Sequence, residues 1–181
     1  EKNIVVVGIF VVDLSFVSRK LPSPGQTLIG DDYIIGPGGK GSNQCVAISR
    51  TGGRASFIAR IGDDEFGNIG LQLYKNENVN YDGIIIAKGV KTGSASICID
   101  HKGMNSIVVV PGASSGLTKS MIDSNLQIFE DSSICLTGFE IPIEVVTYCL
   151  KIAKSKNLRT ILNPAPYSSI DKEVYKMVDF L

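Results

Sequence analysis

The sequence predicts an α/β fold of three layers, α/β/α, in the Rossmann-like, doubly wound style, with a small β-sheet attached. Three observations support this prediction. Strand-like apolar runs alternate with helix-like segments along most of the 181 residues. The first run, "NIVVVGIF" at residues 3–10, is continuously apolar, which is typical of a parallel strand buried on both faces. Two β-rich segments, residues 14–36 and a hairpin around His101, interrupt the alternation.

The first half of the chain supplies the expected core elements in order. "SNQCVAISRTGG" follows a glycine-rich loop, and its apolar positions suit a short buried helix that ends at Gly52 and Gly53. The elements expected after it are a strand at residues 55–62, an amphipathic helix at residues 64–76 and a strand at residues 82–87.

The second half begins with two strand-like runs in place of the alternation of strands and helices. "TGSASICID" and "NSIVVVPG" flank a polar turn from His101 to Gly103, which indicates a β-hairpin. Alternation then returns, with helices expected at residues 118–129, 142–157 and 171–178, and strands at 132–139 and 159–166. The last residues, "MVDFL", read as the start of another strand, and the chain does not begin with Met. We therefore expect the chain to be a fragment of a longer protein.

The interruptions define two expected units. Residues 1–13, 37–90 and 111–181 form an incomplete α/β core, and residues 14–36 and 91–110 form a β lid. We expect the two lid segments to pair as one small sheet over an edge of the main sheet. A lid in this place could close over a site at the carboxyl ends of the strands. The alternative is that both segments are surface hairpins without a role.

Composition excludes several classes of function. The 18 basic and 18 acidic side chains give a net charge of zero, with no basic stripe, so we expect no nucleic-acid partner. No run of 18 apolar residues is present, so we expect no membrane span. The cysteines form no C-x-x-C pair and His101 is the single histidine, so we expect no zinc site. Reduced core thiols in a cytoplasmic protein are the simplest interpretation of Cys45, Cys98, Cys135 and Cys149.

The loop "GPGGKGSNQ", residues 36–44, has the spacing G-x-G-x-x-G but fits neither common nucleotide loop. A Walker loop needs Ser or Thr directly after its lysine, and here Lys40 is followed by Gly41. A dinucleotide loop directly follows the first strand, and here the glycines come more than twenty residues after Gly8. A loop that holds an uncharged polar ligand is the remaining interpretation.

The residues of this loop suit a polyol, whose hydroxyls both donate and accept hydrogen bonds. Gly39 allows a close backbone approach, Lys40 offers donors, and Asn43 offers donors and an acceptor. Carboxylates would complete such a site. Asp13 and Glu140 both follow predicted strands, at the edge where α/β sheets bind ligands. Taken singly, each acid could equally be a helix cap or a solvated loop residue.

These motifs together resemble the PfkB family of carbohydrate kinases, in particular its ribokinase branch. "GGKGSNQCVAISRTGGRASFIARIGDDEFG" is similar to the first signature of the family. "LPSPGQT", "TGSASICID" and "VVVPGAS" resemble lid segments, and "LNPAPY" resembles an N-P-A-P stretch of the ribokinase branch. The resemblance runs from about residue 4 to residue 181 and implies a ribokinase-like three-layer fold whose C-terminal part is missing.

The resemblance also implies a reaction and a site. Family members transfer a phosphoryl group from ATP with Mg²⁺, and with K⁺ in some, to a primary sugar hydroxyl, which in ribose is the 5-hydroxyl. Carried over to this chain, the substrate-binding residues would be Asp13, Gly39, Lys40, Asn43 and Glu140 for hydroxyls, and Ala95 and Val109 for the apolar face of the sugar. The lid of such proteins implies a homodimer.

Two departures from the family pattern qualify these expectations. Val11 stands where ribokinases carry an asparagine, so one sugar-binding amide is missing and the preferred sugar is open. The N-x-x-E and D-T-x-G-A-G-D motifs of the family are absent, so the chain contains no expected catalytic base and no metal ligand. Alone, it should therefore bind sugar weakly and not turn over. The alternatives are another PfkB kinase, acting on a nucleoside, pentose or hexose, and a truncated module that only binds sugar or dimerises.

Overall fold

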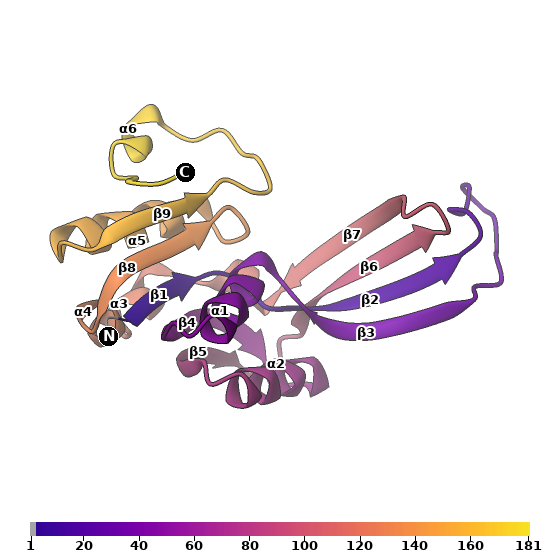
Figure 1. Cartoon of the computed structure of the whole chain (residues 1–181), viewed down its shortest axis with the longest axis horizontal. Helices are drawn as coiled ribbons and strands as arrows, with labels where there is room; N and C mark the ends of the chain where they lie inside the picture. The colour runs from indigo at the N-terminus through magenta and orange to yellow at the C-terminus, as the bar shows by residue number, and fades with distance from the viewer. Residues whose placement is uncertain (1–2) are drawn as a thin grey trace.

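A computed structural model describes residues 3–181 and confirms the three-layer α/β/α fold (Figure 1). The main sheet has five strands in the order β5-β4-β1-β8-β9, and every neighbouring pair is parallel. The bounds of these strands are β1 Asn3–Val7, β4 Ala55–Gly62, β5 Asn80–Ala87, β8 Ser132–Gly138 and β9 Arg159–Asn163. The central position of β1 explains its unbroken apolar sequence, because both of its faces are covered.

A second sheet, of four strands, projects away from the core (Figure 1). Its order is β3-β2-β6-β7, with bounds β2 Val11–Ser18, β3 Asp32–Gly38, β6 Thr92–Asp100 and β7 Asn105–Gly112. Each outer pair is antiparallel, and the two inner strands, β2 and β6, pair in parallel. The two β-rich segments therefore meet in one sheet, which we call the lid sheet, and β2 begins at Val11, directly beyond the end of β1.

Helices cover both faces of the main sheet. On one face α1 (Lys40–Arg50) and α2 (Glu65–Asn76) pack over a core that contains Val6, Phe57 and Tyr74. On the other face α3 (Lys119–Asp123), α4 (Leu126–Glu130) and α5 (Ile143–Ser155) pack over a core that contains Val5, Val7 and Phe129. Alternate residues of β1 thus point into the two cores, as the pleat of a strand requires. No helix among residues 3–181 is long and apolar enough to cross a membrane.

Two details differ from the expectations, and a third, at the C-terminal end, agrees with the start of a strand expected there. The single helix expected at residues 118–129 is wrong, because two short helices separate at Asn125, whose side-chain amide donates to the carbonyl of Met121 at 2.8 Å. The last helix, α6 (Lys172–Tyr175), is shorter than expected. The apolar end forms an isolated parallel bridge between Phe180 and Ile161 of β9.

The fold gathers the candidate residues at one edge of the main sheet. β1 and β8 run parallel, so their carboxyl ends lie at the same edge, where β1 leads into the lid sheet and β8 leads to Glu140. The loop Gly38–Gly39 returns the chain from the lid to the start of α1 at this same edge. Ligands of doubly wound sheets bind at such an edge, so the architecture makes it the first place to look for a site.

The C-terminal segment is tied to the core by Asp179, whose carboxylate accepts from Lys154 Nζ at 2.6 Å and from the Thr160 amide at 2.8 Å. These hydrogen bonds, with the Lys154 bond the largest influence, lower the pKa of Asp179 from 3.8 to about 2. A carboxyl whose pKa is lower in the folded state stabilises the fold above its unfolded pKa. That stabilisation disappears as the pH falls through the folded value.

We therefore expect Asp179→Asn to lower the melting temperature near neutral pH, and the difference from the parent chain to vanish between about pH 4 and pH 2. Thermal unfolding followed by circular dichroism across this range measures it. Asp82→Asn, at an exposed position on β5, is the matched control and should show no such pH-dependent difference. A constant difference for Asp179→Asn at every pH would contradict the assignment.

Candidate functional site

The glycine loop places the N-terminus of α1 directly beside the end of β1. Gly39 precedes the helix with φ of +92°, a conformation that favours glycine, and a side chain there would collide with the carbonyl of Ile9. Gly8 and Gly41 also touch, since a Cβ on either residue would lie 2.8 Å from the other's Cα. Because neither glycine has a side chain, the free amides of the first helical turn come down onto the sheet edge.

Glu140 accepts two hydrogen bonds from Lys40 at this helix N-terminus. The backbone amide of Lys40 donates to Oε2 at 2.7 Å, and its Nζ donates to Oε1 at 3.3 Å. The Glu140 side chain is 13% exposed and that of Lys40 is 48% exposed, so the ammonium can still reach a ligand. A carboxylate in this place is favoured by the positive end of the helix dipole as well as by the lysine.

Asp13, Ala95 and Val109 lie on one face of the lid sheet. Asp13 of β2 is opposite Ala95 of β6, and Ala95 is opposite Val109 of β7. Residues that are directly opposite in neighbouring strands point to the same face, so the carboxylate stands beside Ala95, and Val109 lies one strand further on the same face. We call this side of the lid sheet the inner face.

Gly38 allows the Asp13 carboxylate to lie against the glycine loop. A Cβ at Gly38 would collide with all three atoms of that carboxylate group, so no other residue type fits without moving it. Burial raises the pKa of Asp13, and the positive charge of Lys40 partly offsets this effect. Asp13 is thus close enough to Lys40 to feel its charge, which links the inner face to the loop.

The structure therefore brings together most of the residues expected from the sequence. Asn43 lies in the first turn of α1 with an exposed side chain that makes no hydrogen bond within residues 3–181. A small pocket at the same edge is lined by Gly8, Lys40, Gln44, Glu140 and Asn163, among others. Sequence reasoning missed Gln44, although its position four residues after Lys40 puts it on the same side of the helix.

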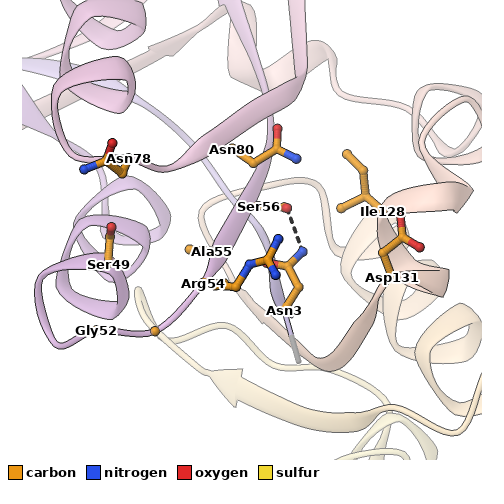
Figure 2. A pocket seen from close by; sticks show the side chains of 11 residues that line it. Asn3, Ser49, Gly52, Arg54, Ala55, Ser56, Asn78, Asn80, Ile128 and Asp131 are labelled. Carbon is orange, nitrogen blue, oxygen red and sulfur yellow. Dashed lines mark hydrogen bonds between the residues drawn. The ribbon is translucent and has the colours of Figure 1, made fainter. Parts of the chain in front are cut away.

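A larger pocket, of about 670 Å³, lies at the opposite edge of the main sheet (Figure 2). There the Asn3 amide donates to Ser56 Oγ at 2.7 Å, and Arg54 and Asp131 stand nearby (Figure 2). This edge receives the C-terminal ends of α1 and α4, whose carbonyls carry partial negative charge. It contains none of the expected site residues, and its helix ends suit the anionic phosphates of a nucleotide poorly.

Comparisons with known proteins show the family of this chain. A family profile described as "pfkB family carbohydrate kinase" matches residues 1–181. The chain belongs to this family. Its relatives include ribokinase from Bacillus subtilis, 34% identical over 99% of this chain, and ribokinase from Mus musculus, 31% identical over 96%. The solved structure of Arabidopsis thaliana ribokinase in complex with ribose and ATP matches 98% of the chain with a TM-score of 0.89 and 27% identity.

This pfkB-family chain spans less than two thirds of the relatives that it matches. It covers 61% of the Bacillus subtilis ribokinase, 54% of the Mus musculus ribokinase and 58% of the Arabidopsis thaliana chain. The comparisons thus extend over the whole of this chain and over a part of each relative.

The contact between Gly38 and Asp13 yields a direct test. We expect Gly38→Ala to displace the Asp13 carboxylate. On the interpretation from sequence that Asp13 binds a sugar hydroxyl, the affinity for that sugar should fall roughly tenfold to a hundredfold, the effect of losing one hydrogen bond to a charged group. Titration calorimetry measures the affinity. Gly36→Ala is the matched control, because a Cβ there meets nothing within 4 Å. Equal affinities in both variants would show that Asp13 does not bind the sugar.

Proposed function

We propose that the chain is the sugar-binding part of an ATP-dependent sugar kinase of the ribokinase type. The reaction is transfer of the γ-phosphoryl group of ATP to the primary 5-hydroxyl of ribose or a related sugar. The observation that carries this proposal is the convergence of Asp13, Lys40 and Glu140 at one edge of the sheet, beside the inner face of the lid. Relatives named ribokinase support it.

Each residue has a distinct task in the proposed site. The Asp13 and Glu140 carboxylates accept hydrogen bonds from neighbouring hydroxyls, and the Lys40 ammonium and the Asn43 amide donate. The Gly39 backbone sits close to the ring of the sugar because nothing projects from it. Ala95 and Val109 cover the apolar face of the sugar and exclude water, which strengthens the polar contacts beneath.

The nucleotide and metal are assigned no residues in this chain. ATP supplies the phosphoryl group, as the complex of the Arabidopsis thaliana relative with ATP supports. Among residues 3–181 no three His, Cys, Asp or Glu side chains gather in a way that could hold a metal ion. We propose that Mg²⁺, and K⁺ where it is used, act with ATP, and we assign them no residue of this chain. The proposed work of this chain is to bind and orient the sugar, and with no base among its assigned residues we propose that it does not turn over alone.

Val11 is the residue that we propose affects which sugar binds. Its side chain is 3% exposed and packs in the core, and a Cβ at Gly93 would lie 2.8 Å from its Cγ1. Val11 is two residues before Asp13 on β2, so both side chains lie on the inner face. An apolar side chain here offers no hydrogen bond to a hydroxyl, which favours a sugar that lacks or inverts the hydroxyl that an asparagine would bind.

A substrate panel tests both the function and this specificity. We expect the chain to bind at least one of ribose, 2-deoxyribose, arabinose, xylose and fructose in calorimetry. We also expect the product of the complete open reading frame to phosphorylate that sugar with ATP. We expect Val11→Asn to improve the affinity for ribose about tenfold relative to the parent's preferred sugar.

The same variant should lower the free energy of unfolding by about 1–3 kcal/mol, because part of the amide is buried. Val11→Ala is the control that removes packing without adding an amide, and it should not change sugar preference. Binding of none of these sugars, or phosphorylation of adenosine in their place, would contradict the proposed substrate class.

We also propose that the chain forms a homodimer through the outer face of the lid sheet. The side chains that alternate with those of the inner face include Phe16, Tyr33, Ile35, Val108 and Val110, and all five are exposed. One apolar face suffices to cover a sugar, so a second exposed apolar face supports a contact with another protein surface. A second copy of the chain would bury the same face by two-fold symmetry.

We expect Val108→Asp to convert a dimer to a monomer in sedimentation velocity experiments, because a charge in the centre of an apolar contact is costly. Ser106→Asp on the same strand and the same face, nearer the tip, is the matched control and should leave more of the dimer intact. A parent chain that is monomeric at all accessible concentrations would contradict the proposed dimer.

The four cysteines support a reducing compartment for this kinase. Cys45, Cys98, Cys135 and Cys149 are all free thiols, and burial raises the pKa of Cys135 to about 12. Buried protonated thiols are unreactive and behave as small apolar side chains. We therefore propose that the protein works in the cytoplasm.

A further inference from the structure

The hairpin of β6 and β7 joins the core at a single place. β6 begins at Thr92, five residues after β5 ends at Ala87, and β7 ends at Gly112, which is directly opposite Thr92. The chain therefore enters the lid sheet at the start of β6 and leaves it at the end of β7 in the same place, beside the N-terminus of α2. We call the junction formed by Gly62, Asp64, Gly67, Thr92 and Gly112 the lid root.

Asp64 holds this root together with one carboxylate. It caps α2 by accepting from the Gly67 amide at 2.9 Å, and it accepts from the Thr92 amide at 2.9 Å and the Thr92 hydroxyl at 2.6 Å. Burial raises the pKa of Asp64, but the hydrogen bonds from Thr92 and Gly67 outweigh this effect and hold the pKa below its usual value. The carboxylate is therefore ionised, and it accepts three charge-assisted hydrogen bonds.

Thr92 also connects Asp64 to the main sheet. Its hydroxyl oxygen also accepts from the amide of Gly62, the last residue of β4, at 2.8 Å. The packing leaves no slack, because a Cβ at Gly62 would collide with the carbonyl of Val90 and one at Gly67 with the carbonyl of Gly62. A core strand, a core helix and a lid strand thus share one buried hydroxyl and one carboxylate.

The end of the hairpin has its own anchor on the same core strand. Arg60 of β4 donates from Nη1 to the Ala113 carbonyl at 2.8 Å, and the Ser114 hydroxyl donates to the Arg60 carbonyl at 3.0 Å. Ala113 and Ser114 directly follow β7. Both strands of this hairpin are therefore tied to the core by side chains.

The other half of the lid has a different kind of root. β2 continues from β1 and β3 leads into α1, so both are connected to the core by backbone. Among the described residues, no side-chain hydrogen bond joins Val11–Asp13 or Gly36–Gly38 to the core. The side-chain hydrogen bonds that tie the lid sheet to the core therefore lie on the side of β6 and β7, whereas β2 is held by the continuous backbone and by the buried side chains of Val11 and Val12.

We infer that Asp64, through Thr92, is a positioning residue that sets where the inner face of the lid lies over the site. Ala95 is three residues beyond Thr92 on the same strand, and Val109 is opposite Ala95, so a rotation at the root moves both. The part of this inference that concerns sugar rests on the proposed function. The part that concerns the position of the lid does not.

A distance measurement tests the inference without any sugar. Spin labels at Lys102→Cys in the β6–β7 turn and Lys75→Cys on α2 report the separation of lid and core, in a background where the half-buried Cys98 is changed to Ser. Thr92→Val removes the hydroxyl and keeps the shape of the side chain, whereas Thr92→Ser keeps the hydroxyl. We expect Thr92→Val to broaden or shift the distance distribution, and Thr92→Ser to match the parent.

The outcomes separate clearly. An unchanged distribution in a folded Thr92→Val variant overturns the inference, as does a Thr92→Ser variant that behaves like Thr92→Val. If Thr92→Val does not fold, Asp64→Asn decides instead, because its amide oxygen can still cap α2 while the charge that binds Thr92 is gone. An Asp64→Asn distribution equal to that of the parent then overturns the inference.

A second readout connects the lid root to sugar affinity. For whichever sugar of the panel the parent binds, we expect Thr92→Val to weaken binding about tenfold at a temperature where circular dichroism shows the variant fully folded, and Thr92→Ser to restore it. Unchanged affinity would remove the role in sugar binding. If the parent binds no sugar, the proposed function fails, while the spin-label distances still decide whether Asp64 positions the lid.

Discussion

The contact between Gly8 and Gly41 is the constraint on which the candidate site depends. Two backbones can approach this closely only where both residues lack a side chain. The approach lets α1 start at the very end of β1, so that the Lys40 amide faces the loop after β8 and meets Glu140. With a side chain at either glycine, the helix would stand further from the sheet and the carboxylate would lose its donor.

Elements with a clear local signal were predictable from sequence. The continuous apolar runs gave the parallel strands, and the turn at His101–Gly103 gave the hairpin of β6 and β7. The rule that ligands bind at the carboxyl ends of strands predicted that Asp13 and Glu140 lie at the same edge of the sheet. The structure places Glu140 there in contact with Lys40, from which it is 100 positions away in the sequence. These signals depend on a few neighbouring residues, which is why they are readable in one sequence.

Features that depend on long-range packing were not predictable. The break at Asn125 was missed because the apolar periodicity of residues 118–129 continues across it. The end of α3 is marked by hydrogen bonds from the side chains of Ser124 and Asn125 to the carbonyls of Ser120 and Met121. The space beside Gly38 is filled by a carboxylate from another strand, which no local pattern reveals. The contact between Asp64 and Thr92 was hidden for the same reason, because the two residues are 28 positions apart in the sequence.

The parallel pairing of β2 with β6 has a consequence for how the molecule assembles. Each lid hairpin joins neighbouring strands, through residues 19–31 in one and 101–104 in the other, but the two hairpins meet where β2 pairs with β6, and these strands are separated in the sequence by β3, α1, β4, α2 and β5. Strand pairings between segments so far apart in the sequence have a high entropic cost of loop closure, so they form late in folding. During synthesis on the ribosome, the strand that carries Asp13 must therefore wait, with one long edge unpaired, until the chain has been made as far as Asp100.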